Sequence, residues 1–423
     1  MAGTLAIWLR GDKVALVAQE RSKKRLRLHY TEAALKRYPL NVPLLSLSLP
    51  LRPEPYTHGV VAPFLDGLLP EGESRLVIAA DLDLLASDTY GLIRALGRDC
   101  AGALIIQPDE EPLPPQPTIF TAEPINDVEL GELVANLRSA PLGVGGRVRI
   151  SLAGVQEKLL LTRMNNGAWG RPVDGTPSTH ILKPELAVYP NTVENEAFCM
   201  RLAKNLGLQV AAVETTTVSD RKLLVVERYD RLIHPDGSVE RIHQEDFCQA
   251  VGLPPQKKYQ EDGGPSLRRV ANILQSSATG DSIQTLLRAV TLNVVIGNGD
   301  AHAKNFSLLQ DPSGVLRLAP LYDLLSTLFY NDDRLAMYVD DVRRTDRVTA
   351  DRLLNEAVSW GLARPRAYDV VADILDRVPA AADAAQSETN GLPSGVRAAV
   401  DSQVAQLLSA FTATGESTNA TSV

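Results

Sequence analysis

The chain has 423 residues, a formal net charge of −8 and a sequence pI near 5.4. A chain of this length is too long to fold around one compact hydrophobic core, so two or three domains are expected. The acidic balance argues against a broad, sequence-independent nucleic-acid surface, which needs excess Lys and Arg. The cysteines, Cys100, Cys199 and Cys248, lack the spacing of zinc ligands or of a disulfide scaffold, which predicts buried free thiols and a reducing cytoplasm. Since no apolar run is long enough to span a bilayer, no membrane partner is expected.

The first hundred residues predict a small α+β domain. Apolar runs at Leu5–Leu9 and Val14–Val17 flank a Gly-Asp turn, which is typical of a β-hairpin. Alternating apolar residues predict further strands at Leu26–Tyr30 and Leu45–Leu51. Three helical stretches, at 61–69, 74–80 and 90–96, and a closing strand at Ala101–Ile106 complete this domain.

Residues 107–130 are rich in proline and acid and predict a linker, because proline lacks an N–H donor and stiffens the chain. A strand-rich stretch, 131–235, and a mainly helical one, 236–410, then predict an α+β fold of two lobes with a cleft. The small polar end, 411–423, predicts a flexible tail.

The elements expected in the two lobes follow from periodicity and turn residues. The predicted strands are Val148–Leu152, Lys158–Thr162, Thr179–Lys183, Val210–Val218 and Lys222–Arg228, with a turn at Asn165–Gly167 and a helix from Asn191 to Gly207. In the helical stretch the predicted elements are a helix over Ser282–Ile296 and one hairpin, formed by Phe306–Gln310 and Val315–Leu318.

The segment GNGDAHAKNF, residues 297–306, joins an apolar helix to a strand and concentrates polar residues. Its Asp300 and Asn305 stand in D-x-x-x-x-N spacing, as in the catalytic loop of protein kinases. In such a loop the carboxylate orients the substrate hydroxyl and accepts its proton, and the amide oxygen helps to hold Mg²⁺. The alternative interpretation is an Asx-rich turn without catalytic function.

Asp323, in LAPLYDL, is a second carboxylate shortly downstream. A nucleotide-bound Mg²⁺ requires such a hard oxygen ligand and keeps some of its waters. The alternative for an isolated aspartate is a helix N-cap. The pairing with Asp300 and Asn305 favours the metal.

Lys183, in THILKPE, stands on a short apolar strand. Burying a lysine without an anion is costly, and the phosphate oxygens of ATP would be a suitable partner. Glu196 in the next helix is the acid expected to hold this lysine, with Glu194 as the other candidate. A lysine that points to water from the strand end is an equal alternative.

The segment SLAGVQEK, residues 151–158, joins two predicted strands. Its small residues would let backbone N–H groups approach phosphate, and Gln156 and Lys158 add donors. It is neither a Walker motif nor G-x-G-x-x-G, so a tight hairpin without a ligand is an equal alternative. The later segment 225–230 could offer backbone groups to adenine, or be an edge strand with a surface ion pair.

Taken together and in this order, these segments resemble the HipA family of type II toxin–antitoxin kinases. The matching pieces are PFLDGLLPEGESR, RISLAGVQEKLLL, THILKPE, ENEAFCMRLAKNLGL, VVERYDR, HQEDFCQAVGLPPQKKYQEDGGPS, NGDAHAKNFSLL and LAPLYDLLS. The resemblance implies an N-terminal HipA-type subdomain at 1–106, followed by a protein-kinase-like fold with an ATP-binding lobe at 131–235 and a helical catalytic lobe at 236–410. Tyr322-Asp323 replaces the Asp-Phe-Gly of eukaryotic-type kinases, and no His-Arg precedes Asp300.

The resemblance also implies a role for individual residues. Asp300 would be the catalytic base, and Asn305 and Asp323 would hold Mg²⁺. Ser151 matches the serine that the family autophosphorylates, a modification that ejects the loop from the ATP pocket. The residues expected to bind ATP are Ala153, Gly154, Val155, Gln156, Glu157 and Lys158 around the phosphates, Lys183 beside them, Glu227, Arg228 and Tyr229 at the adenine, and His302, Ala303, Lys304, Asn305, Tyr322 and Asp323 in the rest of the pocket.

The family's properties also imply partners. Its substrates are aminoacyl-tRNA synthetases, of which glutamyl-tRNA synthetase is the best known, and blocking one arrests translation and growth. Its antitoxin partner is HipB, a small helix-turn-helix protein that binds operator DNA. The acidic charge balance agrees with DNA contacts made mainly through such a partner.

Two other functions stay open from the sequence alone. A small-molecule phosphotransferase of the aminoglycoside-kinase type has a similar Gly-Asp-x-x-x-x-Asn loop, although it would not need the N-terminal domain. A non-catalytic co-repressor bound to an antitoxin would keep the nucleotide pocket only for structure.

Overall fold

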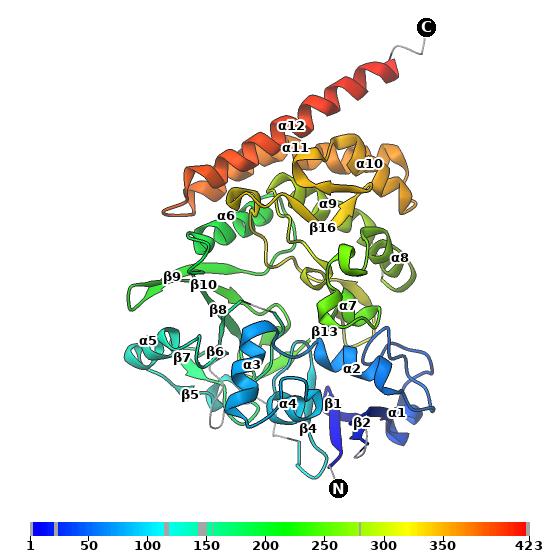
Figure 1. Ribbon diagram of the computed structural model, residues 1–423, viewed down its shortest axis with the longest axis vertical. Helices are drawn as coiled ribbons and strands as arrows, with labels where there is room; N and C mark the ends of the chain where they lie inside the picture. The colour runs from blue at the N-terminus through cyan, green and yellow to red at the C-terminus, as the bar shows by residue number, and fades with distance from the viewer. Residues whose placement is uncertain are drawn as a thin grey trace. The chain divides into compact units, whose positions relative to one another are not determined.

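A computed structural model describes residues 3–20, 24–113, 118–142, 150–154, 156–278 and 281–419, with the side chains of the last helix described to residue 409. The chain divides into two compact units, and each is considered by itself. The first comprises Met1–Pro184, Thr216–Gln256 and Leu309–Gly314, and the second comprises Glu185–Thr215, Lys257–Leu308 and Val315–Val423. Figure 1 labels their helices and strands.

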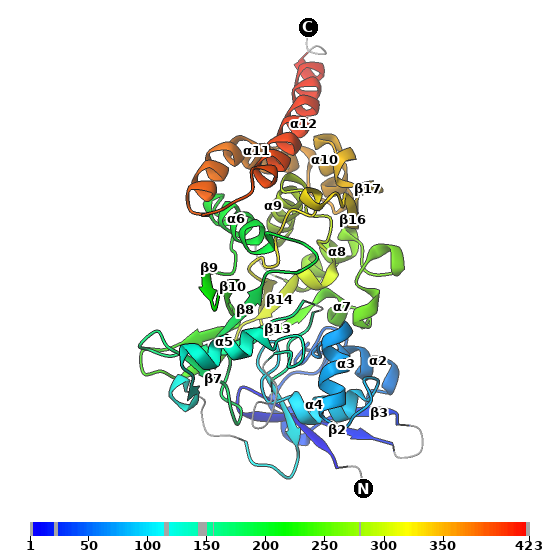
Figure 2. The ribbon, with the colours of Figure 1, turned by 60° about the vertical axis from the view of Figure 1, so that its left-hand side comes forward.

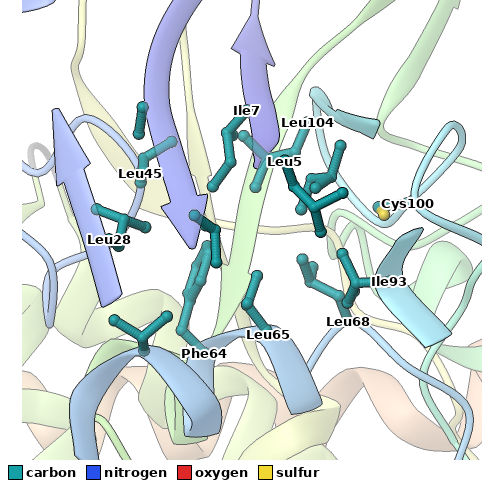
Figure 3. Close-up of a cluster of buried hydrophobic side chains, with 14 of the residues drawn as sticks. Leu5, Ile7, Leu28, Leu45, Phe64, Leu65, Leu68, Ile93, Cys100 and Leu104 are labelled. Carbon is teal, nitrogen blue, oxygen red and sulfur yellow. The ribbon is translucent and has the colours of Figure 1, made fainter. Parts of the chain in front are cut away.

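The first unit begins with an antiparallel sheet in the order β3-β2-β1-β4. The predicted hairpin is confirmed, because β1 and β2 pair with Leu5 opposite Val17 around a turn in which Arg10 and Gly11 have positive φ. Four short helices accompany the sheet, and their apolar faces share one core with it (Figure 3). The elements are β1 (Leu5–Leu9), β2 (Asp12–Gln19), β3 (Leu26–Tyr30), β4 (Leu104–Pro108), α1 (Glu32–Arg37), α2 (His58–Asp66), α3 (Gly72–Asp81) and α4 (Thr89–Leu96).

The strand predicted at Leu45–Leu51 is wrong. These residues form a loop that folds back on itself, with the amide of Leu51 donating to the carbonyl of Val42 at 2.8 Å. Leu45, Leu49 and Leu51 are nevertheless fully buried, and Leu45 points into the core in Figure 3. The alternation that suggested a strand therefore reflects a loop packed on the core, without a sheet partner.

The first unit also contains a sheet in the order β5-β7-β6-β8-β10-β9, covered by one helix. Leu130 and Val134 of that helix, α5, pack on Leu159, Leu182 and Val225 of the sheet. The strands predicted near 158, 179, 210 and 222 are confirmed, as is the Asn165–Gly167 turn. The elements are β5 (Glu123–Pro124), α5 (Asp127–Ala135), β6 (Leu159–Arg163), β7 (Trp169–Arg171), β8 (His180–Pro184), β9 (Val213–Val218) and β10 (Arg221–Glu227).

Two further predictions about this unit need correction. Of the strand expected at 148–152, residues 148–149 lie outside the described residues, and Ile150 forms only an isolated bridge with Asp99. The proline-rich segment 107–130 contains β5, which pairs with β7 at the edge of the sheet. Proline tolerates an edge position because no neighbour needs its missing N–H. The domain boundaries drawn from the sequence stay predictions.

The second unit is mainly helical, and α11 lies against several of its helices. This long helix packs against α6, α9, α10 and α12 (Figures 1 and 2). The predicted helices at 191–207 and 282–296 are confirmed, and Gly207, with φ of 78°, lies just after the C-terminal end of the first. The helices are α6 (Thr192–Asn205), α8 (Leu267–Ser277), α9 (Ser282–Val295), α10 (Ala350–Ser359), α11 (Arg364–Ser387) and α12 (Ser394–Asn419).

The structure extends α12 to Asn419, into the tail predicted at 411–423. Buried Val396, Val400 and Leu407 hold the helix on its neighbours, and extending a formed helix is far easier than starting one. Within the residues that the structure describes, no helix is both long and apolar enough to cross a membrane.

The region after residue 236 contains more strands than the single predicted hairpin. That hairpin is confirmed as β14 (Ser307–Gln310) and β15 (Leu316–Leu318). A second hairpin, missed from the sequence, consists of β16 (Arg334–Val339) and β17 (Val342–Arg344) around Asp340 and Asp341, both with positive φ. The other elements are β11 (Arg231–Ile233), β12 (Val239–Arg241), β13 (His243–Asp246) and α7 (Phe247–Ala250).

A buried charge network links segments of the first unit that are far apart in sequence. Asp99 is fully buried and contacts Arg228, Arg231 and Arg241, with the shortest distance 2.8 Å, to Arg231. Asp230 forms ion pairs with Arg228 at 2.8 Å and Arg231 at 3.0 Å, and accepts the amide of Gly102. Although burial alone would raise the pKa of Asp99 and Asp230, the arginines hold both below their usual range. The network therefore joins the segment before β4 to the strands after β10.

Candidate active site

The loop that carries Asp300 begins where α9 ends, and buried amide side chains fix its start. Gly297 adopts φ of 63°, a conformation that glycine tolerates best. Asn298 is fully buried, donates to Asn293 Oδ1 at 2.8 Å and accepts the amide of Asp300 at 3.1 Å. The Asx contacts allowed by the alternative interpretation are thus present, and they orient the backbone at Asp300.

Gly299 ties the same loop to β16 and to Thr327. Its amide donates to Thr327 Oγ1 at 2.8 Å, and its carbonyl accepts the amide of Ala336 at 2.7 Å. A Cβ atom at this position would lie well inside van der Waals contact with the Arg334 carbonyl. Only glycine therefore fits this close approach of two backbones.

Asp300 is a largely desolvated carboxylate held at one oxygen. Its Oδ1 accepts a hydrogen bond from Tyr259 Oη at 2.9 Å. Burial raises the pKa of Asp300 to about 6, with the negative charge of Asp323 adding to this, while the Tyr259 bond and the Lys258 charge oppose it. A carboxyl group with a pKa in this range can accept and release a proton near neutral pH.

Asn305 closes the loop onto Asp300. Its Nδ2 donates to the Asp300 carbonyl at 3.1 Å, and its backbone amide donates to the His302 carbonyl at 2.9 Å. The first of these bonds fixes the amide plane with the nitrogen toward the loop. The side-chain oxygen is then the atom of Asn305 that can serve as a metal ligand.

Tyr322 and Asp323 lie in the same region, but a different segment of the chain positions them. Leu321 pairs with Val210 through two backbone hydrogen bonds, which places the residues that follow. Tyr322 Oη donates to the Lys304 carbonyl at 2.6 Å, and Asp323, at φ of 58°, interacts electrostatically with Asp300. No helix starts at Asp323, so the N-cap alternative is wrong.

His302 and Lys304 are buried within the loop. Burial, followed by the positive charge of Lys258, lowers the pKa of His302 to about 3, so its imidazole is neutral at physiological pH. In the described part of the chain His302 Nδ1 has no hydrogen-bond partner. A buried polar atom without a partner usually marks a place that a ligand or water occupies. This atom, Asn305 and Asp323 fit a polar ligand beside the loop.

The donor set suits Mg²⁺ bound together with phosphate. Among the described residues no three His, Cys, Asp or Glu side chains gather as a metal site. Mg²⁺ in nucleotide sites commonly takes one or two protein oxygens and completes its shell with phosphate and water. Asn305 and Asp323 could supply those two oxygens.

The expected phosphate segment lies in the first unit, and most of it is described. Gly154 adopts φ of 116°, and its carbonyl accepts the amide of Glu71 at 3.2 Å. Lys158 Nζ donates to the Ala153 carbonyl at 2.8 Å, which curls the segment over itself. Gln156 and Glu157 are half-buried, and Val155 lies outside the described residues.

Ser151 is fully buried next to that segment. Its hydroxyl donates to the Leu68 carbonyl at 2.6 Å, and its amide donates to the Asp99 carbonyl at 2.9 Å. Leu68 belongs to the motif PFLDGLLPEGESR. Ser151 must leave this position before a kinase could modify it.

The other nucleotide-binding candidates of the first unit sit on β8 and at the end of β10. Lys183 is buried on β8, opposite Leu224 of β10. Arg228 belongs to the buried charge network, and its amide already donates to the Thr179 carbonyl at 2.9 Å. The Arg228 carbonyl also accepts the amide of Arg231 at 3.2 Å, so only its second lone pair remains for adenine. Glu227 is exposed, and Tyr229 Oη donates to Gln244.

Comparisons with known proteins agree over most of the chain. Residues 5–107 match the HipA N-terminal domain, and residues 150–382 match the HipA-like C-terminal domain. The chain belongs to the HipA family. It is 40% identical over 400 residues to the putative kinase Y4mE of Sinorhizobium fredii, covering 92% of this chain and 93% of that one. It is 34% identical over 342 residues to the serine/threonine-protein kinase toxin HipA of Shewanella oneidensis, covering 77% of each.

A solved structure of a family member has the same fold. The complex of Shewanella oneidensis HipA, HipB and operator DNA matches with a TM-score of 0.82 and 30% identity, covering 96% of each chain. This HipA-family chain thus has the expected α+β architecture, an N-terminal subdomain followed by a kinase-like fold. The resemblance drawn from its motifs is confirmed.

In this HipA-family chain the site residues divide between the two units. The second unit brings together Asp300, His302, Lys304, Asn305, Tyr322 and Asp323, while the candidates at 153–158, 183 and 227–229 belong to the first. Glu194 and Glu196, the expected partners of Lys183, are buried on α6 in the second unit. Pairing of Lys183 with either glutamate stays a prediction.

Sequence reasoning missed Tyr259 and Thr327, which contact the loop that carries Asp300. Both approach it from a distance in sequence, so no local spacing predicts them. The only signal for Tyr259 was its place in the motif PPQKKYQEDGGPS, which carried the resemblance but no assigned chemistry.

Proposed function

We propose that this chain is an ATP- and Mg²⁺-dependent serine/threonine protein kinase, the toxin of a type II toxin–antitoxin pair. The observation that carries the proposal is the arrangement at Asp300, a desolvated carboxylate coupled to Asp323, with Asn305 folded onto the same loop. The names of the relatives as kinases and as a kinase toxin support it. The N-terminal HipA domain disfavours a small-molecule phosphotransferase.

In this proposal the residues of the loop have different roles. When bound, ATP would supply the phosphoryl group, and Mg²⁺ would neutralise its charge. Asp300 would accept the proton of the substrate hydroxyl, and the oxygens of Asn305 and Asp323 would hold the metal. The neutral His302 offers its unpartnered Nδ1 to the bound nucleotide or to water. We also expect Lys158, Lys183 and residues 153–157 to contribute to phosphate binding and residues 227–229 to adenine binding, as the sequence predicts.

The substrate and partners of the proposal come from the family. We expect the target to be an aminoacyl-tRNA synthetase, with glutamyl-tRNA synthetase the first to test, and its modification to stop translation in the cytoplasm. We also expect a HipB-like helix-turn-helix antitoxin that makes most of the operator DNA contacts. The relative solved with HipB and operator DNA supports this expectation.

The test is incubation of the purified full chain with labelled ATP, Mg²⁺ and a panel of aminoacyl-tRNA synthetases. Asp300→Asn is expected to lower transfer by about 100- to 10,000-fold, the range that proton transfer to a positioned base contributes. Expression of the wild type, but not of this variant, is expected to arrest growth. Ser151→Ala is expected to remove self-labelling while the fold persists.

Three outcomes would contradict the proposal. Labelling by Asp300→Asn at the wild-type rate would remove Asp300 from the mechanism. Mg²⁺-ATP binding without transfer to any protein would favour the co-repressor. Transfer to an aminoglycoside, with drug resistance in place of growth arrest, would favour the small-molecule phosphotransferase.

A further inference from the structure

Residues 258–264 form a tight turn that packs on the catalytic loop. The Tyr259 carbonyl accepts the amides of Asp262 at 3.1 Å and Gly264 at 2.9 Å. A Cβ atom on Gly264 would collide with the carbonyls of Lys257 and Tyr259. Gln260 Oε1 accepts the amide of Tyr338 at 2.9 Å, which fixes the turn to β16. The turn is thus held by backbone hydrogen bonds and by Gln260, and it belongs to the same unit as Asp300.

This turn contacts the catalytic loop at three points. The Lys258 carbonyl accepts the amide of Ala303 at 3.2 Å, and Tyr259 Oη donates to Asp300 Oδ1 at 2.9 Å. The Tyr259 ring also meets the His302 ring edge to face, with centroids 5.4 Å apart. The backbone bond and the ring contact fix the tyrosine, so its hydroxyl has a defined direction.

We propose that Tyr259 is a positioning residue for the catalytic base: its hydroxyl holds Oδ1 of Asp300 so that Oδ2 is presented to the substrate hydroxyl. The inference rests on the proposed function and adds to it a residue outside the D-x-x-x-x-N loop. A carboxylate that is hydrogen-bonded at one oxygen keeps a single orientation. That orientation determines how often the other oxygen is in place to accept the substrate proton. Tyr259 itself need not touch the substrate.

Lys258 places a cation at the same turn. Its Nζ lies 5.3 Å from the centroid of the Tyr259 ring, within range of a cation–π contact. Its positive charge is opposite in sign to the charge of the nearby Asp300 carboxylate. The turn thus supplies a hydrogen-bond donor and a positive charge, which both support a carboxylate in a desolvated loop.

The test compares Tyr259→Phe with wild type in initial rates of labelled phosphate transfer over a range of ATP concentrations. Phenylalanine keeps the ring against His302 and removes only the hydroxyl. We expect the maximal rate to fall about 10- to 100-fold, the range for a hydrogen bond to a charged group. The half-saturating ATP concentration and the melting temperature should stay close to wild type, which a merely structural role of the hydroxyl would not produce.

Two further variants complete the comparison. Tyr338→Phe, a tyrosine on β16 in the same unit, is the matched control and should transfer at the wild-type rate. Gly264→Ala keeps Tyr259 but moves the turn that carries it, so we expect the same fall in maximal rate with little change in half-saturating ATP.

The outcomes separate this inference from the proposed function. If Asp300→Asn is inactive while Tyr259→Phe transfers within twofold of wild type, the positioning role is overturned and the kinase remains. A rise in half-saturating ATP that accounts for the whole loss in Tyr259→Phe would also overturn it. Full activity of Asp300→Asn would instead remove the kinase mechanism on which the inference rests.

Discussion

Asp300 and Glu245 are two buried acids whose surroundings differ. Burial raises the pKa of both Asp300 and Glu245. Asp300 adjoins a second carboxylate and belongs to a loop with an unpartnered histidine nitrogen. Glu245 instead accepts the Ser46 hydroxyl and the Leu47 amide, and so fastens the loop after α1 to β13. A raised pKa alone therefore identifies a desolvated acid, and its neighbours decide whether it has a chemical role.

Glu245→Gln tests the structural role of that acid through pH. Because burial raises the pKa of Glu245 to about 7, the folded state binds the proton more tightly than the unfolded state. The stabilising effect of protonated Glu245 is complete at low pH and is lost as the pH rises through about 7. Glutamine keeps the shape without the charge, so at pH 8 we expect the variant to be more stable by about 1–3 kcal/mol.

The measurement is urea unfolding of both proteins at pH 5 and pH 8. The gain should be present at pH 8 and small at pH 5. Glu32→Gln, an exposed acid on α1, is the control and should show no such dependence. A difference that is equal at the two pH values would show that ionisation of Glu245 is not its cause.

At the scale of elements, the loop that carries Asp300 depends on its fit against β16. Gly299→Ala would push a methyl group into the Arg334 carbonyl and the Thr327 hydroxyl. We expect a loss of about 1–3 kcal/mol of stability, as for other overpacked sites, and a fall in phosphate transfer of 10-fold or more. Thermal unfolding and the labelled-ATP assay measure the two effects.

Gly59→Ala is the matched control for this substitution. Gly59 is an exposed position in the first turn of α2 with nothing within 4 Å of an added Cβ atom. Alanine favours helix more than glycine does, so stability should rise slightly and activity should not change. Equal effects of the two alanine substitutions would show that the close approach at Gly299 is not needed.

Elements with a strong local signal could be predicted from the sequence. The turn between β1 and β2 and the apolar periodicity of α6 and α9 are local, and so is the Asp300–Asn305 spacing. The errors arose where tertiary packing decides. Leu45–Leu51 alternates like a strand but serves as a core-facing loop, and the Asp340-Asp341 turn lacks the Asn-Gly signal of a hairpin. Tyr259 reaches Asp300 across 41 positions, a contact that no local pattern carries.

At the scale of the molecule, the charge network around Asp99 gives the first unit much of its cohesion. Three arginines surround two buried aspartates, and the arginines also donate to the carbonyls of Cys100, Gly102 and Gly175. Removing one partner from such a cluster leaves uncompensated buried charge, which is more harmful than never having the cluster. Asp99 is the most sensitive member because it faces all three arginines.

Asp99→Asn is therefore expected to destabilise the first unit by about 3–5 kcal/mol. The measurement is urea unfolding followed by tryptophan fluorescence, for which Trp8 and Trp169 report on this unit. Glu32→Ala, which breaks an exposed ion pair with Lys36, is the control and should cost less than about 0.5 kcal/mol. A loss as small as that of the control would mean that the cluster contributes little.

The network also limits how genes of this family could exchange parts. A chimera that takes its first hundred residues from a relative must receive an acid at the position of Asp99, since the recipient brings Arg228, Arg231 and Arg241. Without that acid Arg228 and Arg231 would keep their ion pairs with Asp230, and Arg241 would lose its ion pair with Asp99. Recombination near residue 110 should succeed only between parents that agree on this charge, so the two segments are expected to be inherited together.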